Sequence, residues 1–405
     1  MKVWILKDSE PLPLTPEVKP LRAAMLSEAL VARGHAVRWW CSTMSHFHKT
    51  REAQAGSYTL ENAKGTYNVQ RIEAGLYARN LSVARVLHHR RLAKCWREAA
   101  EQSHETPNII LVAYPIIEWV REALAYAKPR GIPVVVDVRD QWPDTFVNYA
   151  PSLLKPFVWL VAKILYPNVP ALFRAPRAVT SMSTPVLHWA LHKARRAEGD
   201  DTRVFYLGTS LSQTLQQSTR TQLPTDRPTR CLFLGTLGHT ADVLTIGQAA
   251  RYMHENNQNV HITIAGDGDY MQSLRDVVEG LPNVTLTGWR STADAKLLLA
   301  ASDIALLTGH NEAMPNKFFD YVAAGLPIVC SLRGEVRDYI TRHHLGACCP
   351  SGDAQALARA INHVREHYSA CAKAVQAVPA SDYACDAIYA SFVTFLEQLG
   401  NHHAV

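Results

Sequence analysis

Short apolar runs alternate with amphipathic segments along the chain. A run at Val3–Leu6 is followed by helically spaced apolar residues over 21–33 and by a second run at Ala36–Trp40. Parallel strands need a crossover between them, so this order predicts a β-α-β unit. Further strands are predicted at 109–113, 134–138, 179–182 and 204–208, with a helix at 116–128.

A polar, proline-containing segment interrupts this alternation at 213–228, where we expect a linker. A second series of strands and helices follows, and a final helix is predicted at 384–399. The sequence therefore predicts an α/β protein with two parallel-sheet domains. Their expected bounds are 1–212 and 229–378, and residues 379–405 form a C-terminal helix that we expect to pack back on the first domain.

The stretch Thr308–Cys330 has the most specific pattern. It predicts a strand end, a polar loop, a helix beginning at Pro315, and a stop at Gly325 before the next strand. Asn316 and Lys317 open the helix, where free N–H groups and the helix dipole favour an anion. The carboxylates of Glu312 and Asp320 flank this point. They suit sugar and ribose hydroxyls, and Lys317 suits a diphosphate.

Two further strand ends carry candidate residues, because ligands of open parallel sheets bind beyond the carboxyl ends of strands. Arg139 and Asp140 follow the strand at 134–138, where they suit a phosphate and a sugar hydroxyl. The alternative is a mutual ion pair that caps the next element. His46 follows the strand at 36–40, either reaching a cleft between the domains or lying solvated in a loop.

Glycines follow two strands of the second series. Gly235 and Gly238 come after the apolar run at 231–234 and would let the backbone approach a phosphate, although a plain turn fits equally. Asp267-Gly-Asp269 has the form of a metal-binding pair of carboxylates, but it stands where a tight turn starts a helix. We expect the turn, and no metal.

Composition narrows the class of protein. With 405 residues, 47% hydrophobic and 19% charged, the chain is long enough for two folded domains. The eight cysteines form no C-x-x-C pair, which argues against a zinc site or a disulfide framework. We find neither an apolar run long enough to span a membrane nor a signal peptide, and we expect a cytoplasmic protein.

Charge is distributed unevenly. Residues 1–212 hold 28 basic and 18 acidic residues, whereas residues 213–405 hold 14 and 18. Residues 145–197 contain no acid, and within them 153–166 is apolar, aromatic and flanked by Lys155 and Lys163. This segment, with Trp159, predicts either an interfacial helix on an anionic membrane or a core helix. We expect no nucleic-acid partner, because the basic residues do not belong to a recognisable nucleic-acid-binding motif.

These features together resemble the GT-B glycosyltransferases, specifically glycosyltransferase family 4, over essentially the whole chain. The resemblance is most specific in the segment 315–328, Pro-Asn-Lys-Phe-Phe-Asp-Tyr-Val-Ala-Ala-Gly-Leu-Pro-Ile. Gly34-His35, the Arg-Asp-Gln-Trp-Pro at 139–143 and the Gly-Thr-Leu-Gly at 235–238 support it. The Arg-Asp-Gln-Trp-Pro at 139–143 and the Pro-Asn-Lys at 315–317 look most like the bacterial branch that builds surface polysaccharides such as O-antigen and capsule.

The resemblance implies two Rossmann-like domains facing across a cleft and a retaining, metal-independent hexosyltransferase reaction without a cofactor. It implies that Glu312 faces the donor sugar, Asp320 the ribose and Lys317 the phosphates. The residues expected to act in catalysis are Glu312, Lys317, Asp140 and Arg139. The donor-binding set adds Gly235, Gly238, Arg290, Pro315, Asn316 and Asp320.

The chain departs from the family pattern at two places. No Arg and Lys follow the glycine-rich turn, so Lys317 and the helix start carry more of the phosphate binding, with Arg290 as a helper. Arg139 also stands where many members have a histidine.

The resemblance implies a nucleotide sugar as donor and a lipid-linked or saccharide acceptor at the inner face of the cell membrane. His46, Lys155, Trp159 and Lys163 are expected on the acceptor or membrane side. Two alternatives remain open: a GT-B sugar-nucleotide epimerase or hydrolase, and a non-catalytic GT-B partner subunit.

Overall fold

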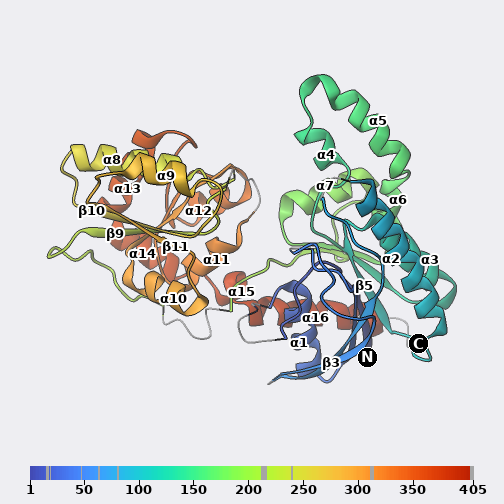
Figure 1. Ribbon diagram of the computed structural model, residues 1–405. Helices are drawn as coiled ribbons and strands as arrows, with labels where there is room; N and C mark the ends of the chain where they lie inside the picture. The colour runs from blue at the N-terminus through green and yellow to red at the C-terminus, as the bar shows by residue number, and fades with distance from the viewer. Residues whose placement is uncertain are drawn as a thin grey trace. The chain divides into compact units, whose positions relative to one another are not determined.

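The computed structural model describes residues 1–14, 18, 20–46, 48–62, 64–79, 82–210, 217–238, 240–310 and 314–401. The chain divides into two compact units (Figure 1). Unit 1 holds residues 1–207 and 389–405, and unit 2 holds residues 208–388. The chain therefore passes between the units twice, first before Gly208 and again inside its last helix.

Unit 1 is built on an eight-stranded sheet in the order β3-β4-β2-β1-β5-β6-β7-β8. Its described strands are β1 (Lys2–Leu6), β2 (Ala36–Ser42), β3 (Gly56–Asn62), β4 (Gly65–Ile72), β5 (Ile109–Tyr114), β6 (Val134–Val138), β7 (Ala178–Ser181) and β8 (Thr202–Val204). Neighbouring strands are parallel, as the sequence predicts, except that β3 runs antiparallel to β4. This antiparallel edge was not predicted, because β3 is only half-buried and has no continuous apolar run.

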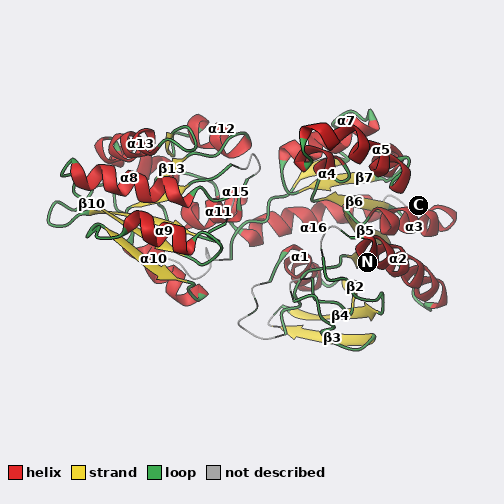
Figure 2. Ribbon diagram, turned by 45° about the horizontal axis from the view of Figure 1, so that its top comes forward, coloured by secondary structure: helices red, strands yellow, loops and turns green. Residues whose placement is uncertain are grey.

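Helices cover both faces of this sheet (Figure 2). The described helices of unit 1 are α1 (Arg22–Ala32), α2 (Val83–Gln102), α3 (Ile117–Ala127), α4 (Asp144–Tyr149), α5 (Lys155–Leu165), α6 (Val169–Arg174) and α7 (Thr184–Ala194), with 3-10 turns at Lys128–Arg130 and Ser152–Leu154. Helix α2 begins at Val83, where the Ser82 hydroxyl caps it by accepting from the Arg85 N–H at 3.2 Å.

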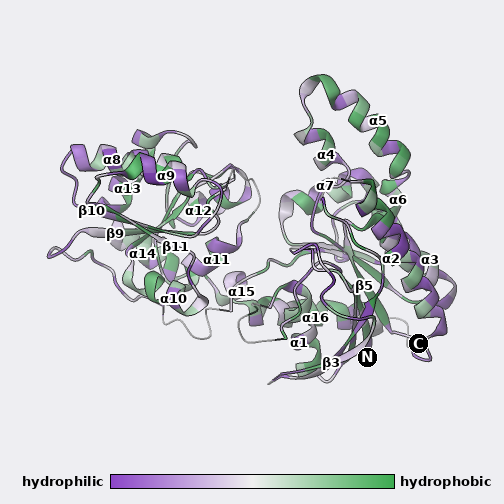
Figure 3. Cartoon of the chain, viewed as in Figure 1, coloured by the Kyte–Doolittle hydropathy of each residue, from purple (hydrophilic) through white to green (hydrophobic). Residues whose placement is uncertain are grey.

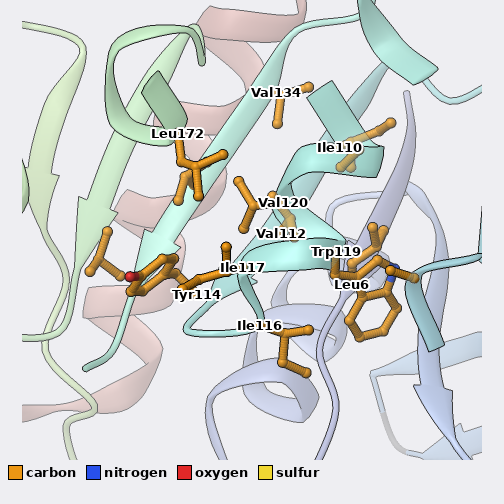
Figure 4. Packing of buried hydrophobic residues seen from close by; sticks show 14 of the residues in the cluster. Leu6, Ile110, Val112, Tyr114, Ile116, Ile117, Trp119, Val120, Val134 and Leu172 are labelled. Carbon is orange, nitrogen blue, oxygen red and sulfur yellow. The ribbon is translucent and has the colours of Figure 1, made fainter. Parts of the chain in front are cut away.

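The core of unit 1 lies between the sheet and α3. Figure 4 shows Leu6, Val112 and Val134 from three strands meeting Trp119 and Val120 of α3. All five side chains are at most 3% exposed. Burying a side chain of this size contributes about 1.5–3 kcal/mol relative to leaving it in water, so these contacts fix α3 and the strand ends beside it.

The final helix, α16 (Cys385–Asn401), completes unit 1 from residue 389 onwards. Phe392 stacks on Phe205 with ring centroids 4.1 Å apart. Glu397 accepts from Arg33 and pairs with His35, each at 2.8 Å. In place of the strand predicted at 204–208, β8 ends at Val204. The carbonyls of Phe205 and Tyr206 accept from the guanidinium of Arg22 instead of continuing the strand.

Unit 2 is built on a six-stranded, fully parallel sheet in the order β11-β10-β9-β12-β13-β14. Its described elements are β9 (Thr229–Leu234), α8 (Val243–Glu255), β10 (Val260–Ala265), α9 (Met271–Val278), β11 (Val284–Gly288), α10 (Thr292–Ala301), β12 (Ile304–Leu307), α11 (Asn316–Ala323), β13 (Ile328–Cys330), α12 (Glu335–Arg342), β14 (Gly346–Cys348), α13 (Ala354–Glu366), α14 (Tyr368–Gln376) and α15 (Ala380–Tyr383). Numbered within the unit, this order is 3-2-1-4-5-6, the order of Rossmann folds.

Residues 217–228, the described part of the predicted linker, belong to unit 2. Buried Asp303 holds them by accepting from Arg220 and, at 2.6 Å, from Arg227. The same carboxylate accepts from the Arg230 N–H at 2.9 Å, so the segment is tied to the start of β12. Asp353 caps α13 by accepting from the Ala356 N–H at 2.8 Å.

Candidate active site

The strand order of unit 2 reverses between β9 and β12, which places a crevice beyond the carboxyl ends of these two strands. Gly235 follows β9, and Gly266 follows the adjacent β10. The two turns approach so closely that a Cβ on Gly266 would lie 1.8 Å from the carbonyl oxygen of Gly235. Only glycine fits there, so the glycine-rich turn packs backbone against backbone.

Lys317 points from the first turn of α11 toward this turn. Its Nζ lies 4.0 Å from the centroid of the Phe233 ring and 2.8 Å from the place a Cβ on Gly235 would occupy. Burial lowers the pKa of Lys317 to about 8, and no carboxylate of the described residues counteracts that shift. Lys317 is therefore a partly desolvated cation, held against an aromatic face and suited to an anion.

Helix α11 is fixed to the sheet by Tyr321. The Tyr321 hydroxyl accepts from the Leu234 N–H at 3.0 Å and donates to the Leu306 carbonyl at 3.2 Å, which joins the ends of β9 and β12. Pro315 caps the helix instead of occupying its first position, because its ψ of 150° is extended. The exposed Asn316 opens the helix, and its N-terminal amides lie beside Lys317.

Asp320 lies one turn further along α11. Its Oδ1 accepts from the Thr209 hydroxyl at 2.5 Å, and the Thr209 amide donates to the carbonyl of Tyr383 at 2.8 Å. The predicted ribose-binding carboxylate is thus oriented by the segment that opens unit 2. Glu312, its predicted partner, lies outside the described residues.

A chain of side chains that sequence reasoning missed lies at the same edge of the sheet. Asp242 accepts from Ser351 and from the Gly352 N–H, both at 2.9 Å, and the Ser351 hydroxyl lies 2.9 Å from Nδ1 of His310. Because Ser351 gives its proton to Asp242, His310 is the donor in the second bond. His310 belongs to the 308–330 stretch, but its partner Ser351 is 41 residues away, so no sequence motif indicated the chain.

Two other predicted donor residues lie at this edge without touching Lys317. Gly238 lines a small pocket of about 100 Å³ with Asp242, Tyr270 and His310. A Cβ on Gly238 would meet only Thr236, at 4.0 Å, so no close backbone approach requires glycine there. Arg290 is exposed after β11, which is separated from β9 by β10, and it forms no hydrogen bond or ion pair with another described residue.

Asp267-Gly-Asp269 forms the expected turn. The Gly268 N–H donates to Asp267 at 2.8 Å, and the turn leads into α9. In the described ranges no cluster of three His, Cys, Asp or Glu side chains is arranged to hold a metal ion.

Arg139 follows β6 in unit 1, where its guanidinium is held by two carboxylates. Its Nε donates to Asp137 at 2.9 Å, and its Nη1 donates to Glu10. Asp137 also forms a two-bond ion pair with buried Arg22, at 2.8 and 2.9 Å. These cations hold the pKa of Asp137 well below its usual range despite burial.

The mutual ion pair considered for Arg139 and Asp140 is therefore absent. Asp140 instead accepts from the Gln141 N–H at 2.7 Å and from the Thr145 hydroxyl at 2.9 Å, which fixes the entry to α4. Neither partner of Arg139 was foreseen, since Glu10 lies 129 residues away in the sequence.

His46 follows β2 and is half-buried rather than solvated. Its Nδ1 lies 2.6 Å from the Tyr77 hydroxyl and 3.4 Å from Nζ of Lys49. Burial and the neighbouring charges of Lys49 and Arg85 lower its pKa to about 4, so the imidazole is neutral at pH 7.

The predicted interfacial segment forms the 3-10 turn Ser152–Leu154 and helix α5, which project from the body of unit 1 and are largely apolar (Figure 3). Leu153, Phe157 and Ile164 are 94%, 65% and 70% exposed, so α5 is not a core helix. Lys155 is exposed, and Nζ of Lys163 lies 4.1 Å above the half-exposed ring of Trp159. In the part of the chain that the structure describes, no helix is long and apolar enough to cross a membrane.

Comparison with known proteins finds a family that matches most of unit 2. The family described as "Glycosyl transferases group 1" matches residues 228–367. Among curated relatives, TuaC of Bacillus subtilis, named provisionally as a teichuronic acid biosynthesis glycosyltransferase, is 23% identical over 67% of this chain and 65% of its own length. The amylovoran biosynthesis glycosyltransferase AmsK of Erwinia amylovora is 29% identical over 33% of this chain and 35% of its own length. The chain thus spans less than two thirds of these relatives.

Solved structures match the chain over nearly its full length. Sucrose-phosphate synthase of Thermosynechococcus elongatus aligns with a TM-score of 0.71 at 15% identity, covering 98% of both chains. HepE of Anabaena, solved with UDP and glucose, aligns with a TM-score of 0.63 at 16% identity, covering 98% of this chain and 100% of its own. The chain has the GT-B fold, and its predicted resemblance to GT-B glycosyltransferases is confirmed. Its placement in family 4 stays a prediction.

Proposed function

We propose that the protein transfers a hexose, with retention and without a metal, from a nucleotide-diphosphate sugar to a lipid-linked or saccharide acceptor in bacterial surface polysaccharide synthesis. The observation that carries this proposal is Lys317, a desolvated cation at the first turn of α11, beside the glycine turn at the β9–β12 switch point. Relatives named for teichuronic acid and amylovoran biosynthesis support the polymer class. HepE, solved with UDP and glucose, supports the donor class.

The chemistry of the site fits a departing nucleoside diphosphate. As the bond between the sugar's anomeric carbon and the phosphate oxygen breaks, negative charge develops on the diphosphate. The Lys317 ammonium and the N–H groups that open α11 would stabilise that charge. The acceptor oxygen forms the new bond on the same face of the sugar and gives its proton to the departing phosphate oxygen, so the reaction needs no separate general base.

The remaining predicted residues would hold the donor. Asp320, oriented by the Thr209 hydroxyl, is suited to ribose hydroxyls. Asp320 and the exposed Asn316 lie on the same short helix as Lys317, so one rigid element would bind both ribose and phosphate. We further propose that the acceptor is reached from a membrane surface through α5, which carries exposed apolar residues and two lysines.

The test begins with a thermal-shift screen of UDP, GDP, ADP and their sugars, because a ligand that binds the folded state raises its apparent stability. The donor found this way is used to measure transfer by nucleoside diphosphate release and by mass spectrometry of the product. We expect Lys317→Met to lower kcat/KM for transfer by about 10²–10³-fold. Lys373→Met, which removes an exposed lysine from α14 of the same unit, is the matched control and should change little.

Asp320→Asn and Glu312→Gln complete the test. Transfer that survives all three substitutions would show that the donor pocket is assigned wrongly. Release of free sugar without a transferred product would favour a hydrolase.

A further inference from the structure

Unit 1 contains an apolar pocket of about 360 Å³ between the first half of α2, α4 and α5. Its walls include Val86, Trp142, Phe146, Val161 and Leu165. This volume falls in the range of about 300–1,000 Å³ typical of small-molecule sites. None of the donor residues lines it, so the proposed nucleotide-sugar site does not account for it.

The pocket opens to solvent along an apolar rim. Val83 and Leu87 of α2 line it and are nevertheless 76% and 55% exposed. Phe157 and Ile164, on the facing helix α5, are 65% and 70% exposed. Exposed apolar residues gathered beside an apolar pocket are a feature of binding sites.

The charges on α2 and α5 beside the pocket have one sign. Residues 83–94 of α2 contain Arg85, Arg90, Arg91 and Lys94 without an acid, and α5 contains Lys155 and Lys163 without an acid. Glu118 of α3 lies 3.8 Å from Nε of Arg90, and Asp144 of α4 pairs with Lys193 at 2.6 Å; neither carboxylate lines the pocket. An apolar pocket with cationic walls is complementary to an amphiphile with a hydrocarbon chain and an anionic head.

One end of the pocket carries the cation that would meet the anionic head of such an amphiphile. The guanidinium of Arg85 lines the pocket and lies 4.4 Å from the centroid of the Trp142 ring and 5.7 Å from that of Tyr77. Tyr77 in turn bonds His46 at the carboxyl end of β2. The cationic end of the pocket therefore leads to the sheet edge at which unit 1 carries its polar candidate residues.

We propose that this pocket binds the hydrocarbon chain of a phosphate-bearing lipid, with the phosphate meeting Arg85. This inference rests on the proposed function and deepens it, because it assigns the lipid carrier of the acceptor to a site in unit 1. The pocket holds a single lipid chain by insertion, in contrast to the lipid surface on which α5 would lie.

The test titrates the full chain with dodecyl phosphate below its critical micelle concentration and follows binding by calorimetry. Inorganic phosphate and dodecyl maltoside supply the head group and the chain alone. We expect dodecyl phosphate to bind at least about tenfold more tightly than either, because only it satisfies both the apolar walls and Arg85. Equal binding of inorganic phosphate and dodecyl phosphate would contradict the proposal, since it would show a simple anion site.

Neighbouring residues on α5 supply a matched pair of variants. Val161→Trp fills the pocket, whereas Leu160→Trp places the same ring at a position that is 51% exposed and outside the lining. We expect Val161→Trp to weaken dodecyl phosphate binding about tenfold or more and Leu160→Trp to change it little. Leu87→Glu, at an exposed position that tolerates substitution, adds a negative charge to the rim and should weaken binding similarly. Wild-type affinity in both Val161→Trp and Leu87→Glu would overturn the assignment.

Donor binding separates this inference from the proposed function. Val161→Trp should keep the thermal shift with the nucleotide sugar while losing transfer to a lipid-linked acceptor. If no nucleotide sugar raises the melting temperature of the wild type but dodecyl phosphate binding depends on Val161, the lipid site stands and the proposed transferase function fails. If donor binding and transfer are normal and dodecyl phosphate binding is absent, only the lipid site fails.

Discussion

At the scale of single residues, the proposed donor site depends on how a lysine remains charged away from water. Burial lowers the pKa of Lys317 to about 8, whereas a lysine in water titrates near 10.4. The Phe233 ring offsets part of the lost hydration, and the space at Gly235 lets the ammonium reach it. A bound diphosphate would give the Lys317 ammonium an anionic partner.

This shift predicts a pH dependence of donor binding. Lys317 is protonated below its pKa and neutral above it, and only the protonated form attracts the diphosphate. Raising the pH from 7 to 9 should therefore weaken donor binding by about tenfold as the competent fraction falls. Titration calorimetry at several pH values should show this slope in the wild type but not in Lys317→Met. The same slope in both proteins would assign it to another group.

The glycine turns predict a second residue-scale effect. Gly266 has φ +152°, and a Cβ there would overlap the Gly235 carbonyl at 1.8 Å. Gly266→Ala should lower the unfolding free energy of unit 2 by about 3 kcal/mol or more, because backbone must move. Gly280→Ala is the control. Gly280 has φ +73°, and nothing lies within 4 Å of a Cβ built there. The substitution should therefore cost only the strain of the left-handed conformation, about 1 kcal/mol. Urea denaturation of both variants measures the difference, and equal losses would contradict the packing argument.

At the scale of elements, α11 reaches the switch point because one hydroxyl joins it to two strands. Tyr321 is fully buried and satisfies the Leu234 amide and the Leu306 carbonyl together. Since both groups end their strands beside the site, the position of Lys317 depends on this bond as much as on the helix itself.

Tyr321→Phe should therefore destabilise unit 2 by about 1–3 kcal/mol, because it leaves a buried N–H without a partner. Tyr67→Phe is the comparison: its hydroxyl is buried in unit 1 and has no hydrogen-bond partner among the described residues, so its loss should be nearly neutral. Thermal denaturation measures the loss of stability in both variants, and hydrogen exchange of the Leu234 amide measures the local loss of protection. A Leu234 amide that stays protected in Tyr321→Phe would argue against the proposed tie.

The same scale shows what the sequence can predict. Strands such as β1, β5 and β6 are continuous apolar runs, and the helix opened by Asn316-Lys317 has clear start and stop signals, so these were predicted close to their observed bounds. The hairpin of β3 and β4 was missed, although both strands alternate in exposure, because neither has the continuous apolar run by which the buried strands were recognised. Long-range polar pairs such as Arg139 with Glu10, or His310 with Ser351, leave no local signal, since the fold alone brings them together.

At the scale of the whole molecule, basic charge is concentrated in the first half of the chain. Residues 1–212 carry a net charge of +10, while residues 213–405 carry −4. The exposed apolar residues of the Ser152–Leu154 turn and of α5 belong to the basic half. Each Lys or Arg near an anionic lipid surface contributes about 1 kcal/mol, and apolar side chains add to this by insertion.

Vesicle flotation tests the membrane role at this scale. We expect the wild type to float with vesicles rich in phosphatidylserine and to stay in solution with neutral ones. Leu153→Ser, at a position 94% exposed, should weaken flotation several-fold because it removes an inserting side chain. Leu297→Ser removes a 70% exposed leucine from α10 of unit 2 and should leave flotation unchanged. Failure of the wild type to bind anionic vesicles would exclude the membrane role.

The return of the last helix to unit 1 has a consequence for how the protein is made. Phe392 stacks on Phe205, and Tyr389 and Leu396 are buried in the same unit, so unit 1 is completed by residues that are translated after the whole of unit 2. On the ribosome, unit 2 has all its residues before unit 1 does, although unit 1 emerges first. Until α16 has emerged, the side of unit 1 that receives it exposes apolar surface, which makes the growing chain prone to aggregate during that interval.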